Sequence, residues 1–228
     1  MIFDAASGHT FVEGFRFIAD HPDFLAEKAL EQLELAGAAL GLGAAVALPA
    51  GIVLGHFHRA SGFAIGTSIV VRALPSVVLI GVFLTVLGIG FVNNMVALAV
   101  LATGPVMTNA YDGIDGVERD VVEAARGMGM SRRQILARVE LPLALPLLFT
   151  GIRVAAVTVV ATAPIAAIAG GGGLGDVIVN QASYRLQGVL GACYCVMALS
   201  AGVWIAFLAL QRASTPRGLR AASVNLTD

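Results

Sequence analysis

The sequence predicts an all-α integral membrane protein with about five transmembrane helices. Of its 228 residues, 57% are hydrophobic and only 13% are charged, and the mean hydropathy is +0.85. A soluble domain averages about 45–50% apolar and about 25% charged residues. The chain therefore has too few polar residues to cover a water-facing globule, and it contains five apolar stretches long enough to cross a bilayer.

The five predicted spans follow from the need for about 20 mainly apolar residues per transmembrane helix. They are expected at Leu35–Gly55, Gly62–Leu87, Val92–Tyr111, Leu143–Ala169 and Gly188–Leu210. The second stretch contains Arg72 and Pro75. Because proline removes a helix hydrogen bond, we expect this stretch to be either one broken span or a half-helix followed by a span.

The distribution of Lys and Arg predicts the orientation, because these residues favour cytoplasmic loops. With five spans, the first loop, the third-to-fourth connection and the C-terminal tail share one side and hold nine Lys and Arg residues, whereas the other side holds three. We therefore expect the N-terminus outside and the C-terminus in the cytoplasm. The predicted divisions are an extracytoplasmic segment 1–34 with a surface helix near Asp23–Leu35, a transmembrane domain 35–210 and a cytoplasmic tail 211–228.

Several function classes are not expected from this sequence. The net charge of −1 gives no basic surface for nucleic acid. Intramembrane enzymes need clustered catalytic groups at membrane depth, and ion-coupled carriers use intramembrane acids, but the predicted spans contain no Asp, Glu or His. The chain also lacks a Gly-x-x-x-x-Gly-Lys-[Ser/Thr] motif, so it is not expected to hydrolyse ATP.

The segment Gly113–Pro142 is the one long polar stretch between predicted spans, and we expect it to form two short helices. In the first helix, Asp115 is the expected N-cap, with Glu118 completing a capping box. Gly127 and Gly129 are expected to end this helix, because glycine tolerates the left-handed backbone of a helix C-terminus.

The second short helix is expected to start at Ser131, with Gln134 completing a Ser-x-x-Gln capping box. Each helix has an apolar side, formed by Val117, Val121, Ala124, Ala125 and Met128 in the first and by Ile135, Leu136 and Val139 in the second. A helix–glycine–helix elbow with an apolar ridge fits a groove on another protein. The alternative is an amphipathic loop lying on the membrane surface.

This segment resembles the EAA loop of binding-protein-dependent ABC importer permeases. The matching residues are Glu123-Ala124-Ala125, then Gly129 after three residues, then Val139-x-Leu141-Pro142 after nine more, with Val139 replacing the isoleucine of the family pattern. Other segments are similar to the permeases of osmoprotectant importers, which carry glycine betaine, choline, carnitine or proline betaine. These segments are Arg72–Ser76, Leu87–Phe91, Glu123–Ser131, Glu140–Pro146, Gly151–Arg153 and Gly172–Asp176.

The resemblance implies a permease subunit of the bacterial cytoplasmic membrane that holds no cofactor or metal itself. It implies three partners: a cytoplasmic ATPase dimer that binds ATP–Mg, a second permease subunit (the same or a paralogue) and an extracytoplasmic substrate-binding protein. The implied ATPase-coupling residues are Glu123, Ala124, Ala125, Gly127, Gly129, Met130, Ser131, Leu141 and Pro142. The alternatives are a permease for methionine, phosphonate or sulfonate, or an ATP-independent channel or carrier.

Candidate pathway or gate residues are Arg72, Pro75, Ser76, Arg153, Gly173 and Gly175. Arg153 lies eleven residues after Pro142, which is about 16 Å into the fourth span at about 1.5 Å per residue. An arginine at that depth usually faces a bundle interior or a cavity. The alternative is a structural arginine held by backbone carbonyls at the kinked second span.

Two further clusters carry expectations of their own. The glycine-rich stretch at residues 170–175 is expected to form an outer turn or gate, with Asp176 capping the short helix that follows. A nucleotide-binding loop is not expected there, although Gly170, Gly172 and Gly175 match Gly-x-Gly-x-x-Gly, because no βαβ unit surrounds them. His56 and His58 are expected to be ordinary surface histidines rather than a metal-binding pair.

Overall fold

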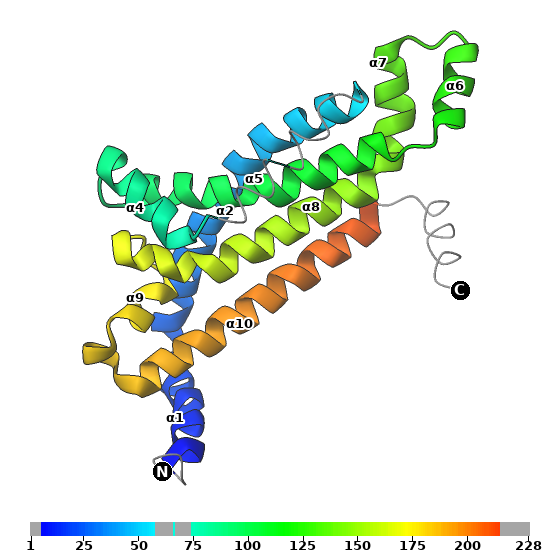
Figure 1. The fold of residues 1–228 in the computed structure, drawn as a ribbon. Coiled ribbons are helices and arrows are strands. Elements are labelled where there is room, and N and C mark those ends of the chain that lie inside the picture. Colours follow the sequence, from blue (N-terminus) through cyan, green and yellow to red (C-terminus); the bar gives the residue numbers. More distant parts are fainter. Residues whose placement is uncertain (1–5, 58–65, 67–73, 215–228) are drawn as a thin grey trace.

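The computed structural model describes residues 6–57, 66 and 74–214, and every element assigned in this part of the chain is helical. Four helical segments are long and apolar enough to cross a membrane: Pro22–His56, Phe91–Asp115, Arg132–Ala169 and Gln181–Ala213. Figure 1 shows the molecule as an elongated bundle with the α6–α7 hairpin at one end and helix α1 at the other. The described chain thus agrees with the predicted all-α membrane fold.

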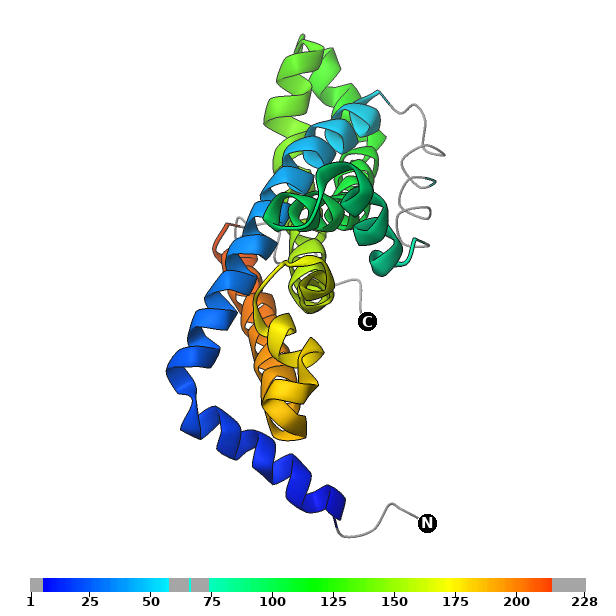
Figure 2. The same cartoon turned by 90° about the vertical axis from the view of Figure 1, so that its left-hand side faces the viewer.

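The N-terminal part differs from the prediction. Helix α1 (Ala6–Asp20) was not expected from the sequence, and α2 (Pro22–His56) is one continuous helix of 35 residues, about 52 Å long. The predicted surface helix near Asp23–Leu35 is therefore the first part of the first long helix and not a separate element. Figure 2 shows α1 bending away from α2 at this point.

Helix α1 is held by packing against α10 (Gln181–Ser214). The ring of Phe15 stacks on that of Tyr194 with their centroids 4.6 Å apart. The backbone of Gly14 approaches the same tyrosine so closely that an added Cβ would lie 2.9 Å from its ring. Tertiary contacts from the far end of the chain therefore stabilise this helix, which explains why local sequence patterns do not reveal it.

Of the second predicted span, the structure describes Gly66 and the residues from Leu74 onward. Helix α4 (Ser76–Leu87) is a 12-residue apolar helix whose N-cap is Pro75, so the predicted interruption at this proline is confirmed. The rest of the predicted span, including the candidate pathway residue Arg72, lies outside the described residues.

The core lies where α2, α5 (Phe91–Asp115) and α8 (Leu141–Thr162) pack together. Glycines bring α2 and α5 close: a Cβ added at Gly43 would lie 2.6 Å from the carbonyl oxygen of Ala99, and one at Gly51 would lie 2.7 Å from that of Met107. Small residues permit this approach, which packing between membrane helices favours.

The helix that contains the fourth predicted span begins earlier than that span. Helix α7 (Arg132–Ile135), the π-helical turn η1 (Leu136–Glu140), α8 and the 3₁₀ turn η2 (Ala163–Ala169) follow one another as a single helical rod from the hairpin to the opposite end. The π turn ends at Glu140, two residues before Pro142, which cannot donate a backbone hydrogen bond. The regular helical hydrogen-bond pattern therefore changes close to a residue without a donor.

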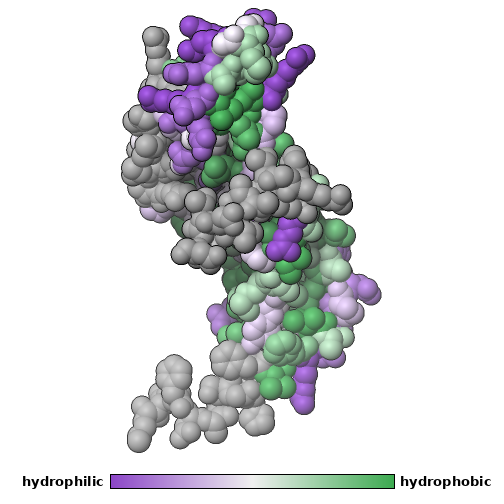
Figure 3. Space-filling view, turned by 90° about the vertical axis from the view of Figure 1, so that its right-hand side faces the viewer, coloured by the Kyte–Doolittle hydropathy of each residue, from purple (hydrophilic) through white to green (hydrophobic). Residues whose placement is uncertain are grey.

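Hydrophobic and hydrophilic residues are separated along the long axis. Figure 3 shows purple, hydrophilic residues gathered at the hairpin end, whereas green, hydrophobic residues predominate further along the molecule with fewer purple ones among them. Large apolar side chains in the described helices remain exposed, among them Val86 at 78% and Ile205 at 59%. Such surfaces suit contact with lipid or with another membrane subunit.

Candidate functional site: the α6–α7 hairpin and its root

The turn of the hairpin forms as the sequence predicts. Helix α6 (Arg119–Gly127) is followed by Gly129 with a φ of +81°, in the left-handed region. The Gly129 N–H donates to the carbonyl of Arg126 at 2.9 Å, and the Met130 N–H donates to that of Ala125 at 3.2 Å. These bonds satisfy the last carbonyls of α6. Gly127 stays helical, so Gly129 alone makes the left-handed turn between α6 and α7.

The predicted start of the second helix is also confirmed. Ser131 is the N-cap of α7, and its backbone N–H donates to Gln134 Oε1 at 2.8 Å, with the reciprocal bond of the capping box present. The box satisfies donors that the first turn of a helix leaves free.

The predicted N-cap at Asp115 is wrong. Asp115 is the last residue of α5, and Glu118 is the N-cap of α6, without a side-chain cap hydrogen bond. Helix α5 continues to this point because Ile114, only 1% exposed, packs into a cluster with Ala144 and Leu148 of α8. Burial of this side chain outweighs the local capping signal.

The residues of the predicted coupling motif lie together on the hairpin, on two different faces. Ala125 is 2% exposed, whereas Glu123, Ala124 and Gly127 are exposed and Met128 is 76% exposed. The expected single apolar side of this helix is therefore divided: Val117 is buried with Ala125, whereas Val121, Ala124 and Met128 face outward. Leu141 and Pro142 are half-buried at the start of α8.

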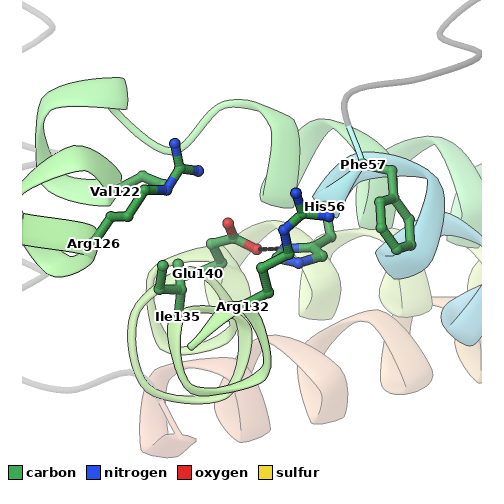
Figure 4. A pocket seen from close by; sticks show the side chains of 7 residues that line it. All are labelled: His56, Phe57, Val122, Arg126, Arg132, Ile135 and Glu140. Carbon is green, nitrogen blue, oxygen red and sulfur yellow. Dashed lines mark hydrogen bonds and ion pairs between the residues drawn. The ribbon is translucent and has the colours of Figure 1, made fainter. Parts of the chain in front are cut away.

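At the root of the hairpin lies a cavity of about 340 Å³, which is lined by a buried contact between a histidine and a glutamate (Figure 4). The His56 ring nitrogen Nδ1 donates to Glu140 Oε2 at 2.5 Å. Glu140 is 1% exposed, and the His56 side chain is 13% exposed. Arg126 and Arg132 line the cavity around this pair.

His56 is thus not an ordinary surface histidine, because it is the last residue of α2 and lies against the hairpin root. Sequence reasoning included Glu140 in a family-like segment but did not identify it as a site residue. The only local signal was an acid directly before Leu141-Pro142, and nothing in the sequence pairs it with a residue 84 positions away. His58 lies outside the described residues. In the described ranges, no group of three or more His, Cys, Asp or Glu side chains has the arrangement of a metal site.

The candidate pathway residues that the structure describes are distributed over separate places. Ser76 lines a groove of about 430 Å³ between α4, α5 and α8, together with Leu101, Pro105 and Thr158. The guanidinium of Arg153, on another face of α8, lies 5.9 Å from the ring centroid of Trp204 in α10. A cation–π contact with α10 therefore accompanies this arginine.

The turn at residues 170–173, here called the glycine loop, connects η2 to α9 (Leu174–Val179) and contains three glycines with positive φ. The Gly173 N–H donates to Glu31 Oε2 of α2 at 2.8 Å. Lys28 Nζ lies 2.8 Å from the same Glu31 oxygen and 3.3 Å from Asp176 Oδ2. The predicted capping role of Asp176 is therefore wrong: its side chain pairs with Lys28, and Gly173 is the N-cap of α9.

Gly175 is required for close packing rather than for a turn. A Cβ added there would lie 2.2 Å from the carbonyl oxygen of Pro164 and 2.8 Å from the Cβ of Ala167. The start of α9 thus lies directly against η2. Asn94 holds the same region from α5, because its Nδ2 donates to the carbonyl of Ala169 at 3.1 Å.

A family model described as the binding-protein-dependent transport system inner membrane component matches residues 47–217. The chain belongs to this family. It is 34% identical over 207 residues to the carnitine transport permease protein OpuCB of Listeria monocytogenes, with 90% of this chain and 95% of that protein covered. It is 33% identical over 205 residues to the glycine betaine/carnitine/choline transport system permease protein OpuCB of Bacillus subtilis, with 90% and 94% covered.

Solved structures show the same fold. The chain superposes on an inward-facing structure of the MetNI methionine ABC transporter with a TM-score of 0.74 at 23% identity, covering 84% of this chain and 96% of that one. An amino acid ABC transporter gives a TM-score of 0.67 at 18% identity. The chain therefore has the fold of an ABC importer permease, a family whose members are not themselves ATPases.

Proposed function

We propose that this chain is the transmembrane permease subunit of an ATP-driven importer of osmoprotectants such as glycine betaine, choline, carnitine or proline betaine. The names of the relatives given above describe them as transporters of such solutes, and they match the chain over about nine-tenths of its length. The exposed Glu123-Ala124 surface of α6, at one end of the rod that includes α8, is the structural observation that carries this proposal.

The hairpin would receive the movement of a cytoplasmic ATPase dimer, which binds and hydrolyses ATP–Mg. Ala124 and Gly127 allow close approach of a partner surface because their side chains are small, and Glu123 offers a carboxylate to a basic partner residue. The buried Ala125 anchors α6 to its own subunit. Because α7, η1 and α8 follow one another without a break, displacement of the hairpin moves α8 as a rigid body.

We place the hairpin and the C-terminus in the cytoplasm and the N-terminus outside. The excess of Lys and Arg on one side of the spans supports this orientation. In Figure 1 the last turns of α10 lie toward the hairpin end, whereas α1 and the glycine loop beside α9 lie toward the other. On this orientation the glycine loop belongs to the outer gate, where an extracytoplasmic binding protein would deliver substrate to this subunit and its second permease subunit.

Ser76 and Arg153 remain our candidates for the substrate pathway, with Gly173 and Gly175 at the gate. The groove beside Ser76 has apolar walls with threonine hydroxyls, which suits a small solute that carries methyl groups. Arg153 would repel a bare quaternary amine but would attract a betaine carboxylate. Its contact with Trp204 leaves the guanidinium half-buried on α8.

The test is uptake of labelled glycine betaine into vesicles that contain this chain with its ATPase and binding protein. We expect ATP-dependent uptake that Glu123→Ala weakens and Gly129→Asp abolishes, with the complex still inserted in the membrane. Asp120→Ala, which removes an exposed carboxylate from the first turn of the same helix, is the matched control and should retain uptake.

Two outcomes would contradict different parts of the proposal. ATP-driven uptake of another solute, such as methionine, without uptake of any betaine or choline would refute the substrate class and leave the permease function intact. If the uptake rate is the same with and without ATP, and neither substitution changes it, the importer function itself is refuted and a channel or carrier is favoured.

A further inference from the structure

Glu140 is the only charged residue classed as buried among those that the structure describes, and the proposed coupling mechanism does not use it. A buried carboxylate is strongly unfavourable unless a partner compensates it. Its partner, His56, comes from a different helix, 84 residues earlier in the chain, at 2.5 Å. Figure 4 shows the two side chains facing each other across the root of the hairpin, with Arg132 beside the histidine.

The contact joins two parts of the molecule that have different neighbours. Glu140 ends the π-helical turn between α7 and α8, so it moves with the hairpin. His56 ends α2, whose extensive packing is along α5 rather than along α6 or α7. The His56–Glu140 pair is therefore a direct polar connection from the hairpin root to α2, separate from the continuous backbone that leads to α8.

The other end of α2 is attached to the glycine loop. Glu31 accepts the Gly173 N–H at 2.8 Å, and Lys28 contacts Asp176 at 3.3 Å. From Glu31 to His56 the helix rises by about 37 Å at about 1.5 Å per residue, somewhat more than the hydrocarbon thickness of a bilayer. Helix α2 thus has polar attachments at both ends, one to the hairpin root and one to the loop at the far end.

We propose that His56 and Glu140 are positioning residues that make α2 a second transmission arm, so that hairpin movement reaches the glycine loop through α2 as well as through α8. This inference rests on the proposed function. A helix is stiff along its axis, so a displacement at the His56 end shifts Glu31 at the other. Loss of the pair leaves ATPase docking intact, because the docking surface is elsewhere on α6, and it lowers the solute moved per ATP hydrolysed.

The experiment uses the complete importer in proteoliposomes and measures solute uptake per ATP hydrolysed. Glu140→Ala and His56→Ala should each lower this ratio about five- to tenfold, at the lower end of the typical coupling between sites, because the connection through α8 remains. The double variant should be no worse than either single one, because both remove the same contact. Glu140→Gln keeps a hydrogen-bond acceptor for His56 and should retain most of the ratio. The matched control is Arg138→Ala, an exposed residue of the same turn.

A second readout does not depend on the solute. Hydrogen exchange at the amides of residues 170–176 should change when a non-hydrolysable ATP analogue binds the wild-type complex. This change should disappear in Glu140→Ala and persist in Glu140→Gln. A variant that merely misfolds would instead fail to bind the ATPase and would show raised exchange throughout α8, whereas the positioning role predicts a loss confined to the response of the glycine loop.

The outcomes separate this inference from the proposed function. If the wild type imports with ATP and the alanine variants keep the wild-type ratio, or if the losses of the two single variants multiply in the double variant, α2 is not a transmission arm. If uptake by the wild type does not depend on ATP, the importer function is refuted and this inference is refuted with it.

Discussion

Replacement of Gly129 by alanine tests whether the shape of the hairpin or free space beside it matters for coupling. Among the residues that the structure describes, none beyond its chain neighbours lies within 4 Å of a Cβ added at Gly129, so crowding by this part of the subunit contributes nothing. The φ of +81° remains, and a left-handed backbone costs a residue other than glycine roughly 1–2 kcal/mol. That cost lowers the population of the observed turn by roughly 5- to 30-fold.

Asparagine at the same position separates this backbone effect from crowding by a partner. Asparagine has a larger side chain than alanine but adopts the left-handed region more readily. We therefore expect Gly129→Asn to retain more ATP-driven uptake than Gly129→Ala, with the ATPase still co-purifying in both cases. Gly127→Ala lies in the helical part and should leave the thermal stability equal or slightly higher, because alanine is the better helix former.

The opposite order would refute the reasoning. If Gly129→Asn loses more uptake than Gly129→Ala, the glycine is needed because a partner surface comes close, and its backbone angle is secondary. If both variants match the wild type, the left-handed turn is not required for coupling at all.

Three further predictions concern the far end of the molecule and the α8–α10 contact. Gly175→Ala should destabilise the subunit by about 1–3 kcal/mol in a thermal unfolding assay, because the new Cβ would overlap the backbone of η2. In the same assay Gly202→Ala should lie within about 1 kcal/mol of wild type, because in the described part of the chain nothing beyond its own helix comes within 4 Å of the added Cβ. Glu31→Ala removes the acceptor of the Gly173 N–H and should cost about 1 kcal/mol, measured as faster hydrogen exchange at that amide; unchanged exchange would contradict the contact. Arg153→Leu should cost about 0.5–1 kcal/mol through loss of the cation over the indole ring and should change tryptophan fluorescence; an unchanged spectrum would show that the ring and the guanidinium do not interact.

Local chemistry predicted those features whose cause lies within a few residues. The capping box at Ser131, the left-handed turn at Gly129 and the helix start after Pro75 each depend on one side chain and its immediate backbone. The same kind of reasoning failed at Asp115, where a plausible cap competes with burial of Ile114 against α8. It failed again at Asp176, whose carboxylate has a lysine partner from α2 instead of a free helix end.

Hydropathy by itself determined that the chain is a bundle of membrane helices, and residue spacing determined where the hairpin lies, because both depend on the order of residues along the chain. Only the tertiary structure decided which polar groups meet. Glu140 and His56, or Glu31 and Gly173, are separated by 84 and 142 positions and are brought together only when the long helices pack. A buried charged group needs a polar partner, but that partner can come from any position in the chain. The packing of the helices, and not the local sequence, therefore determines which residue pairs with it.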